Sequence, residues 1–280
     1  MGSKPRGGAR EASACRGGGR GEPRVRRLDL EWIARSTRGR DLHLFLDFDG
    51  TLAAHRADGG RSVPYRGIIG ELSALSRAGT DRVSIVSGRP VAELKQKLGL
   101  KELYYAGNHG LDIRGPGEAF LHPRAAAARK AIGAAARLIR SRTRRVKGVV
   151  VDQNGLSLSV NFGLVAPLLR LRIRPAIDGL RRETAALGLR WQEGYLGWDL
   201  IFKLGWDKGD AVSRLMRLTR KSLAVAIGDG ASDEPMFRAV GAGGISIRVG
   251  RARGSNARFW VRGVPEVARI LSLLRSRSSR

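Results

Sequence analysis

The stretch HLFLDFDGTLA, residues 43–53, decides the fold class of this chain. An apolar run leads directly into Asp47 and Asp49, and Gly50 and Thr51 follow at once. A run of consecutive apolar residues is typical of a central parallel strand, which is buried on both faces. Two carboxylates at the end of such a strand repel each other unless a positive group lies between them. The stretch therefore predicts a buried strand that presents two acidic groups at one edge of a sheet.

The order of apolar segments along the chain predicts the architecture. From Leu42 to Gly107 short strands alternate with helical spacing, and the same rhythm resumes after Trp206, which predicts a doubly wound sheet. Between them, long helices and a hairpin turn at Asn154 and Gly155 predict an α+β unit. We predict an α/β fold: a doubly wound, parallel-sheet, Rossmann-like core with an inserted smaller α+β cap domain. The expected boundaries are 28–112 and 206–280 for the core and 113–205 for the cap.

The composition limits the possible classes of protein. A chain of 280 residues that is 42% hydrophobic can bury a substantial core. No apolar stretch approaches the roughly 18 to 20 uncharged residues of a membrane span, and the amino terminus does not have the pattern of a secretory signal. The only cysteine is Cys15, so no intrachain disulfide can form. We therefore expect a soluble, cytoplasmic protein with no membrane partner.

The net charge of +27 raises the question of nucleic-acid binding, because clustered Lys and Arg bind phosphate backbones. The basic residues are scattered through every segment and form no stripe interleaved with aromatics, so we expect no specific nucleic-acid partner. Residues 1–27 are basic, rich in Gly and almost without apolar content, and we expect a disordered tail there. A basic protein that binds polyanions stays as an alternative function.

Polar clusters follow three of the predicted core strands. Beside Asp47 and Asp49, the sequences SGR from Ser87 and GDGASDE, with Asp229 and Asp233, each come directly after an apolar strand. Ligands of open parallel sheets bind at the carboxyl ends of the strands, so these groups are expected to meet in one pocket. Clustered carboxylate oxygens select a hard divalent ion, most simply Mg²⁺. The sequence therefore predicts a magnesium-dependent phosphate site.

Each side chain of this pocket has an expected role. Asp47 can attack phosphorus and form an acyl phosphate, while Asp49 protonates the leaving alcohol and later deprotonates the hydrolytic water. Lys208 can neutralise Asp47 and the phosphate. Asp229 is the expected main metal ligand, and Asp233 lies behind it or on Lys208. The phosphoryl oxygens are expected to bind Gly50, Thr51, Ser87, Gly88 and Arg89. Each motif alone also fits an ordinary turn or helix cap, but their order along the chain favours the site.

Four motifs resemble those of the haloacid dehalogenase superfamily phosphatases, namely DFDGTL, SGR, WDKGDA and GDGASDE. The sequence AGNHGL and the insert between SGR and WDKG are similar to the trehalose-phosphate phosphatase branch, and the resemblance covers about residues 42–275. It implies that Asp47 is the nucleophile, Asp49 the acid and base, and Lys208 the third-motif lysine. It also implies that Asp229 binds Mg²⁺ together with Asp47 and the backbone carbonyl of Asp49, and that the substrate is trehalose 6-phosphate.

The cap departs from this resemblance where the sugar is expected to bind. The branch usually has a Glu and a Lys in the first cap hairpin, then His-x-Arg, then Glu-x-Arg-Pro; here the stretches read VDQNG, VNFG and WDLIF. Gly163 and Ile201 stand where the arginines are expected. The remaining candidate sugar-binding groups are His109, Asp152, Asn154, Asn161 and Asp199. His109 either contacts substrate or bonds a backbone carbonyl. A phosphatase for another sugar or small phosphorylated metabolite is therefore the alternative enzyme.

Overall fold

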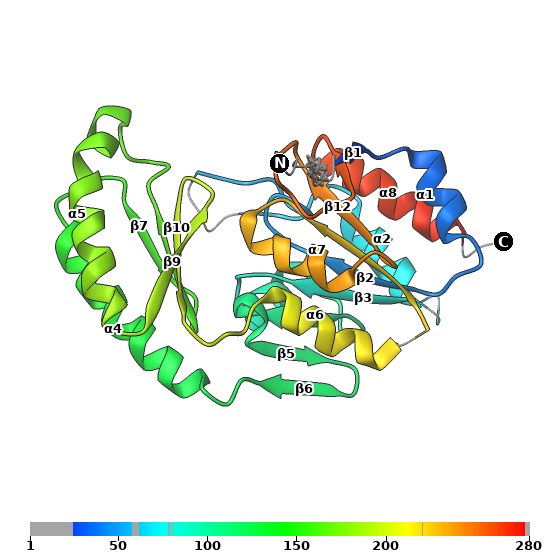
Figure 1. The fold of residues 1–280 in the computed structure, drawn as a ribbon, viewed down its shortest axis with the longest axis horizontal. Helices are drawn as coiled ribbons and strands as arrows, with labels where there is room; N and C mark the ends of the chain where they lie inside the picture. The colour runs from blue at the N-terminus through cyan, green and yellow to red at the C-terminus, as the bar shows by residue number, and fades with distance from the viewer. Residues whose placement is uncertain (1–24, 58–61, 78, 80, 220, 278–280) are drawn as a thin grey trace, which may run out of the picture.

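The computed structural model describes residues 25–57, 62–77, 79, 81–219 and 221–277. In this part the chain forms a core around a nine-stranded sheet and a cap around a four-stranded sheet (Figure 1). Most of the predicted tail, residues 1–24, lies outside the described residues. Arg26–Arg27, also assigned to the tail, form strand β1, and the Arg27 guanidinium lies 2.6 Å from the Glu266 carboxylate. The tail prediction is wrong for these two residues, because they pair in parallel with Phe259 and Trp260.

The strand order of the core sheet is that of a doubly wound fold. From one edge to the other the strands are β1, β13 (Phe259–Val261), β12 (Ile245–Val249), β11 (Leu223–Gly228), β2 (Leu42–Leu46), β3 (Arg82–Val86), β4 (Tyr104–Gly107), β5 (Asp112–Gly115) and β6 (Glu118–Leu121). All neighbours from β1 to β4 are parallel. The order β4-β3-β2-β11-β12-β13 reverses direction between β2 and β11, which is where such sheets bind ligands.

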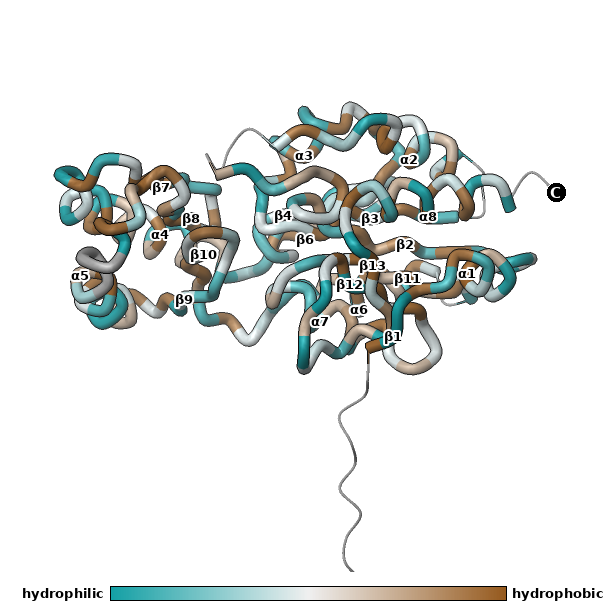
Figure 2. The backbone as a smooth tube through the Cα atoms, turned by 90° about the horizontal axis from the view of Figure 1, so that it is seen from above, coloured by the Kyte–Doolittle hydropathy of each residue, from teal (hydrophilic) through white to brown (hydrophobic). Residues whose placement is uncertain are grey.

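Helices cover both faces of this sheet (Figure 2). One face carries α2 (Ile68–Arg77), α3 (Val91–Leu98) and α8 (Val264–Ser276), with α1 (Leu30–Thr37) against α8, and the other carries α6 (Lys208–Met216) and α7 (Glu234–Val240). Each helix turns an apolar stripe to the sheet, as Ile68, Leu72 and Leu75 of α2 do. Short 3₁₀ turns are η1 (Asn108–Gly110), η2 (Arg217–Thr219) and η3 (Ala231–Asp233). The predicted doubly wound core is confirmed.

The hairpin of β5 and β6 belongs to the core, so the boundary with the cap lies later in the chain than predicted. It pairs antiparallel with β4 and extends the core sheet, so the predicted boundary at residue 113 falls inside the core. The hairpin is tied there by packing that the sequence pattern does not show. Ile113 is fully buried in the core, and a Cβ at Gly115 would lie 2.3 Å from the Tyr104 ring. The cap begins only after β6.

The cap is a sheet with two helices on one face. Its strands, all antiparallel, follow the order β7 (Val150–Gln153), β8 (Ser157–Asn161), β10 (Gly197–Phe202) and β9 (Leu189–Gly194). Helices α4 (Ala125–Thr143) and α5 (Pro167–Ala185) cover the face away from the core (Figure 1). The predicted turn is confirmed, because the Asn154 amide donates to the Ser157 carbonyl and Gly155 has a φ of 71°. No helix in the described ranges is long and apolar enough to span a membrane.

Candidate active site

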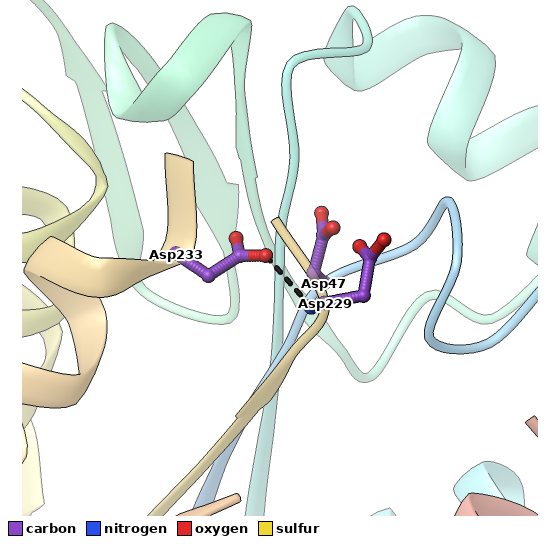
Figure 3. A group of neighbouring side chains, drawn as sticks. All are labelled: Asp47, Asp229 and Asp233. Atoms are coloured by element: carbon purple, nitrogen blue, oxygen red, sulfur yellow. Dashed lines mark hydrogen bonds between the residues drawn. The ribbon is translucent and has the colours of Figure 1, made fainter. Parts of the chain in front are cut away.

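The site lies at the reversal of strand order between β2 and β11. These strands are parallel neighbours, and the Asp47 amide continues their ladder by donating to the Ile227 carbonyl at 2.9 Å. Asp229 follows β11 in the same way, so the two aspartates lie side by side, with Asp233 opposite them (Figure 3). Residues far apart in sequence therefore meet because parallel strands end at the same edge.

Lys208 is the buried cation that links two of these carboxylates. Its Nζ donates to Asp47 Oδ1 at 2.8 Å and to Asp233 Oδ1 at 2.7 Å, and the residue is 2% exposed. It is the first residue of α6, which begins there because the Asp207 carboxylate accepts hydrogen bonds from the amides of Gly209 and Asp210. The helix cap thus fixes the position from which the lysine reaches Asp47.

The electrostatics of this cluster are unbalanced. Burial and then the neighbouring Asp233 raise the pKa of Asp47 well above its usual value, although Lys208 opposes the shift. Burial alone would lower the pKa of Lys208, but Asp233 and Asp47 outweigh it and raise that pKa. Lys208 therefore stays protonated, and the carboxylate cluster has more negative charge than one lysine neutralises.

The donor set fits a divalent cation. Carboxylate oxygens of Asp47, Asp229 and Asp233 lie within 4.8 Å of one another. Asp233 already accepts Lys208 on one oxygen and the amides of Asp229 and Gly230, both at 2.9 Å, on the other. Its oxygens therefore hold the loop and the lysine, whereas Asp47 and Asp229 each have one oxygen bonded, to Lys208 and His55 respectively, and line the open space. Hard oxygen ligands of this charge suit Mg²⁺.

Asp49 is held by an arginine. Arg89 Nε donates to Asp49 Oδ2 at 2.6 Å and Nη2 donates to Oδ1 at 2.8 Å, a two-pronged contact. The same guanidinium donates through Nη1 to Glu93, in the first turn of α3. The sequence prediction placed Arg89 on the phosphate and did not include Glu93. The spacing of four residues between them was the available signal, although Arg89 lies just before α3 and only Glu93 lies in the helix.

The turn after Asp49 uses two of the amides in the predicted phosphate site. Gly50 has a φ of 77°, and a Cβ there would lie 2.3 Å from Asp229, so only glycine fits. However, the Gly50 amide donates to the Ala53 carbonyl at 2.7 Å, and the Thr51 amide to the Phe48 carbonyl at 3.4 Å. These amides close the turn, whereas the Thr51 hydroxyl is buried without a partner among the described residues, so phosphate binding by Gly50 and Thr51 stays a prediction.

A cavity of about 410 Å³ lies between the core and the cap. This volume suits a small organic ligand. From the core it is lined by Asp47, Asp49, Ser87, Gly88, Arg89, His109, Lys208 and Asp229, and from the cap by Asp152, Asn154, Asn161 and Asp199. Of the predicted site residues, only Gly50, Thr51 and Asp233 are not part of its wall. The fold thus brings the predicted catalytic and sugar-binding groups together.

His109 is a neutral wall of this cavity. Its backbone amide donates to the Ser87 carbonyl at 2.9 Å, and a Cβ at Gly88 would lie 2.8 Å from its Nε2. Burial and the charge of Lys208 lower the pKa of His109 to about 3. Among the described residues, its ring bonds no backbone carbonyl, so the geometry agrees with the substrate-facing alternative.

A row of polar side chains crosses the cap sheet on the face toward the core. Asp152 is opposite Ser159, and Ser159 is opposite Asp199, so the three point to the same side. The Ser159 hydroxyl donates to Asp199 Oδ1 at 2.6 Å, and burial raises the pKa of Asp199. Ser159 was not among the sequence candidates, because only the register reveals it.

Asn161 has a structural task in addition to its place in the cavity wall. Its Nδ2 donates to the Tyr195 carbonyl at 3.0 Å, and its Oδ1 accepts the Gly163 amide at 2.7 Å. The first bond ties β8 to the turn between β9 and β10, and the second closes the turn that follows β8. The predicted sugar contact by Asn161 therefore competes with bonds that the amide already makes inside the cap.

Direct contacts join the cap to the core. The Ser157 hydroxyl donates to the Gly88 carbonyl at 3.3 Å, and the Asn108 side chain donates to the Asn154 carbonyl. The His55 ring stacks on Tyr195 with centroids 4.3 Å apart, and its Nε2 lies 2.7 Å from Asp229 Oδ2. His55 thus connects the cap turn to a candidate metal ligand, which no local pattern in the sequence indicated.

The fold and the site together define the class of the protein. A doubly wound core, a cap over the carboxyl ends of its strands, and carboxylates with a lysine beneath that cap characterise the capped haloacid dehalogenase superfamily. The C-terminal domain of a C. albicans trehalose-6-phosphate phosphatase aligns with a TM-score of 0.79 and 19% identity, over 91% of this chain and 99% of that one. A trehalose-6-phosphate phosphatase related protein aligns with a TM-score of 0.71 and 23% identity, over 84% and 97%.

The chain belongs to the trehalose-phosphatase family, whose model matches residues 45–261. The trehalose-phosphate phosphatase of Mycobacterium ulcerans (strain Agy99) is 30% identical over 212 residues, 74% of this chain and 53% of that protein. A probable trehalose-phosphate phosphatase 4 of Oryza sativa subsp. japonica is 29% identical over 256 residues, 86% and 68% of the two chains. The chain thus spans about half the length of the mycobacterial relative.

Proposed function

We propose that this chain is a Mg²⁺-dependent phosphatase that hydrolyses a sugar phosphate, with trehalose 6-phosphate as the substrate. The observation that supports it most is the buried Lys208 between Asp47 and Asp233 beside a cavity that the cap closes. Membership of the trehalose-phosphatase family supports the choice of sugar. A cytoplasmic location, without a membrane or a specific nucleic-acid partner, belongs to the same proposal.

In this mechanism Asp47 attacks phosphorus. Its Oδ1 is held by Lys208, so the carboxylate is oriented, and an aspartyl phosphate forms as the alcohol leaves. Lys208 remains protonated and stabilises charge on the phosphoryl oxygens. Ser87 lines the cavity and offers a hydroxyl to the same oxygens. Mg²⁺, held by Asp47, Asp229 and the Asp49 backbone carbonyl, would supply Lewis-acid charge neutralisation.

Asp49 moves the protons. As an acid it gives a proton to the leaving oxygen, and as a base it takes one from the water that cleaves the aspartyl phosphate. Arg89 donates to both oxygens of Asp49 and so fixes the orientation of this carboxylate. The acid step requires this contact to loosen, and the phosphoryl group offers Arg89 alternative acceptors. This exchange would give Arg89 its predicted phosphate-binding role.

The cap would choose the sugar. Asp152, Ser159 and Asp199 present oxygens to the cavity, and such groups can bind sugar hydroxyls. Closing the cap excludes water, and contacts to the remote sugar can then be expressed as catalytic rate. The replacement of the expected arginines by Gly163 and Ile201 favours a second candidate, a phosphatase of the same chemistry for another sugar or small phosphorylated metabolite.

Phosphate release from a panel of sugar phosphates by the purified full chain with Mg²⁺ tests the proposal. The highest kcat/KM is expected for trehalose 6-phosphate. A higher value for another sugar phosphate would select the second candidate. No turnover of any phosphomonoester would refute the proposed function.

A further inference from the structure

A second cavity of about 440 Å³ adjoins the catalytic one. We call it the crevice. Arg190 and Gln192 of the cap strand β9 line one side, and Arg238 of the core helix α7 lines the other. The crevice shares His109 and Lys208 with the catalytic cavity. A ligand in it would therefore lie beside the phosphoryl site and between the two domains.

The two carboxylates of the crevice are already engaged. Asp207 caps α6 and accepts the Gly209 amide at 2.8 Å. Glu234 accepts Arg248 Nη1 at 2.9 Å on one oxygen and the Asn256 amide at 2.6 Å on the other. Both charges are directed into their own domain, so neither leaves the crevice strongly repulsive to an anion.

The side-chain donors of Arg190, Gln192 and Arg238 in the crevice, by contrast, have no carboxylate partner among the described residues. Arg190 Nη1 donates to the side-chain oxygen of Gln192, Oε1, at 2.7 Å, and Arg190 forms no ion pair with a described residue. The Gln192 amide nitrogen is buried and has no hydrogen-bond partner within the described part of the chain. Arg238 is exposed and likewise forms no ion pair there. A buried donor without a partner is costly, and an acceptor from a ligand would satisfy it.

Lys208 also lines the crevice, but its charge is already paired. Its ammonium is bonded to Asp47 and Asp233, so the free positive charge of the crevice comes from the two arginines. We propose that the crevice is a second anion-binding subsite, which takes a small oxyanion, a phosphate or carboxylate group, between Arg190 of the cap and Arg238 of the core. Because the arginines belong to different domains, the bound oxyanion links the cap to the core.

The oxyanion has two possible sources. It is either free inorganic phosphate or a second anionic group on a ligand whose phosphoryl group lies at Asp47. Only a second anionic group on the substrate rests on the proposed function. Binding of free inorganic phosphate does not depend on it and can be measured without turnover.

Calorimetric titration of inorganic phosphate into the full chain tests the subsite. The titration is done with chelator at constant ionic strength, so that the unneutralised aspartates disfavour phosphate in the catalytic cavity. We expect saturable one-to-one binding that Arg238→Gln and Arg190→Gln each weaken about tenfold. Arg129→Gln, which removes one exposed charge on α4, is the matched control and is expected to change nothing.

Absence of saturable binding would overturn the subsite. An equal loss in Arg129→Gln would also overturn it, because binding would then reflect only the general positive charge. Circular dichroism checks that the variants fold; Arg238 is exposed, so its replacement leaves the core packing in place. If binding is intact but no phosphomonoester is hydrolysed, the subsite stands and the proposed function fails.

A kinetic comparison identifies the source. The kcat/KM of the parent is measured for a sugar monophosphate and for the same sugar with a second phosphate, and again for Arg238→Gln. A loss confined to the bisphosphate assigns the subsite to the substrate. An unchanged ratio, with phosphate binding lost in the calorimeter, assigns it to free phosphate.

Discussion

The core and cap walls of the catalytic cavity differ in how far their polar groups are paired. In the core, Lys208 donates hydrogen bonds to two carboxylates, and Arg89 donates to both oxygens of Asp49. In the cap, Asp152 forms no side-chain hydrogen bond with a described residue, and Asp199 has one, to Ser159. Charged groups that are held in place can stabilise one transition state, whereas polar groups without a partner can form hydrogen bonds to a ligand. Under the proposed function, this difference places the chemistry in the core and the choice of substrate in the cap.

Asp47→Asn is expected to have the largest effect. The amide cannot attack phosphorus, so kcat is expected to fall at least about 10⁴-fold on every phosphate ester. Asn fills the same volume and removes a buried charge, so the thermal midpoint is expected not to fall. Phosphate release and thermal unfolding are measured together. Substantial turnover by this variant would break the assignment of chemistry to the core.

Removal of divalent metal comes next. Chelator is expected to lower kcat at least about 10³-fold, because the charge of the aspartate cluster is then left unneutralised against the phosphate. Added Mg²⁺ is expected to restore the rate in the parent but not in Asp229→Asn. Full activity in chelator would contradict a metal role for Asp229.

Asp199→Ala tests the cap directly. Loss of a charge-assisted hydrogen bond to a sugar hydroxyl is expected to lower kcat/KM for the true sugar phosphate about 10-fold to 100-fold. An aryl phosphate, which makes no such contact, is expected to change little. Asp178→Ala, on the exposed side of α5, is the control. Equal losses on both substrates would show that Asp199 supports the chemistry and not the choice of sugar.

Two buried groups, His43 in the core and Asp199 in the cap, are expected to make opposite contributions to the pH dependence of stability. Burial lowers the pKa of His43 in the core to about 3, so its contribution to stability is present above pH 6.5 and is lost as the pH falls toward 3. Burial raises the pKa of Asp199 in the cap, so its contribution is present at low pH and is lost as the pH rises.

Urea unfolding from pH 7 to pH 5 measures the core effect. The parent is expected to lose about 2 kcal/mol through His43 over this range. His43→Gln keeps a polar group for Ser84 and Thr219 but does not titrate, so it is expected to lack this part of the loss. The same slope in both proteins would show that His43 does not carry the pH response.

Glu93→Gln is expected to have the smallest effect. Among the described residues Glu93 forms ion pairs with Arg89 and Lys97, so its charge is expected to act on the reaction through the orientation of Arg89. We expect kcat to fall about threefold to tenfold with KM little changed, on sugar and aryl phosphates alike. A fall in kcat for the sugar phosphate alone would show that Glu93 affects the choice of substrate. It would contradict the assignment of substrate choice to the cap.

The sequence alone predicted the elements of the fold and the main polar groups of the core site. Apolar runs and helical spacing depend on residues close in sequence, so they predicted the alternating strands, the insert and the hairpin turn at Asn154. Because every parallel strand ends at the same edge, the strand ends also predicted that Asp47 and Asp229 would meet. Lys208, 161 residues from Asp47, was placed by its motif at a helix start.

Tertiary structure decided the partners and the boundaries. Three features depend on contacts that the sequence pattern does not show. They are the two hydrogen bonds from Arg89 to Asp49, the use of the Gly50 amide within its own turn, and the pairing of the β5–β6 hairpin with the core sheet. In the cap, the sequence shows only that arginine is missing at Ile201. The register shows that Arg190 stands directly opposite it on β9. Sequence spacing reports which face a side chain takes, but only strand pairing fixes its neighbours across the sheet.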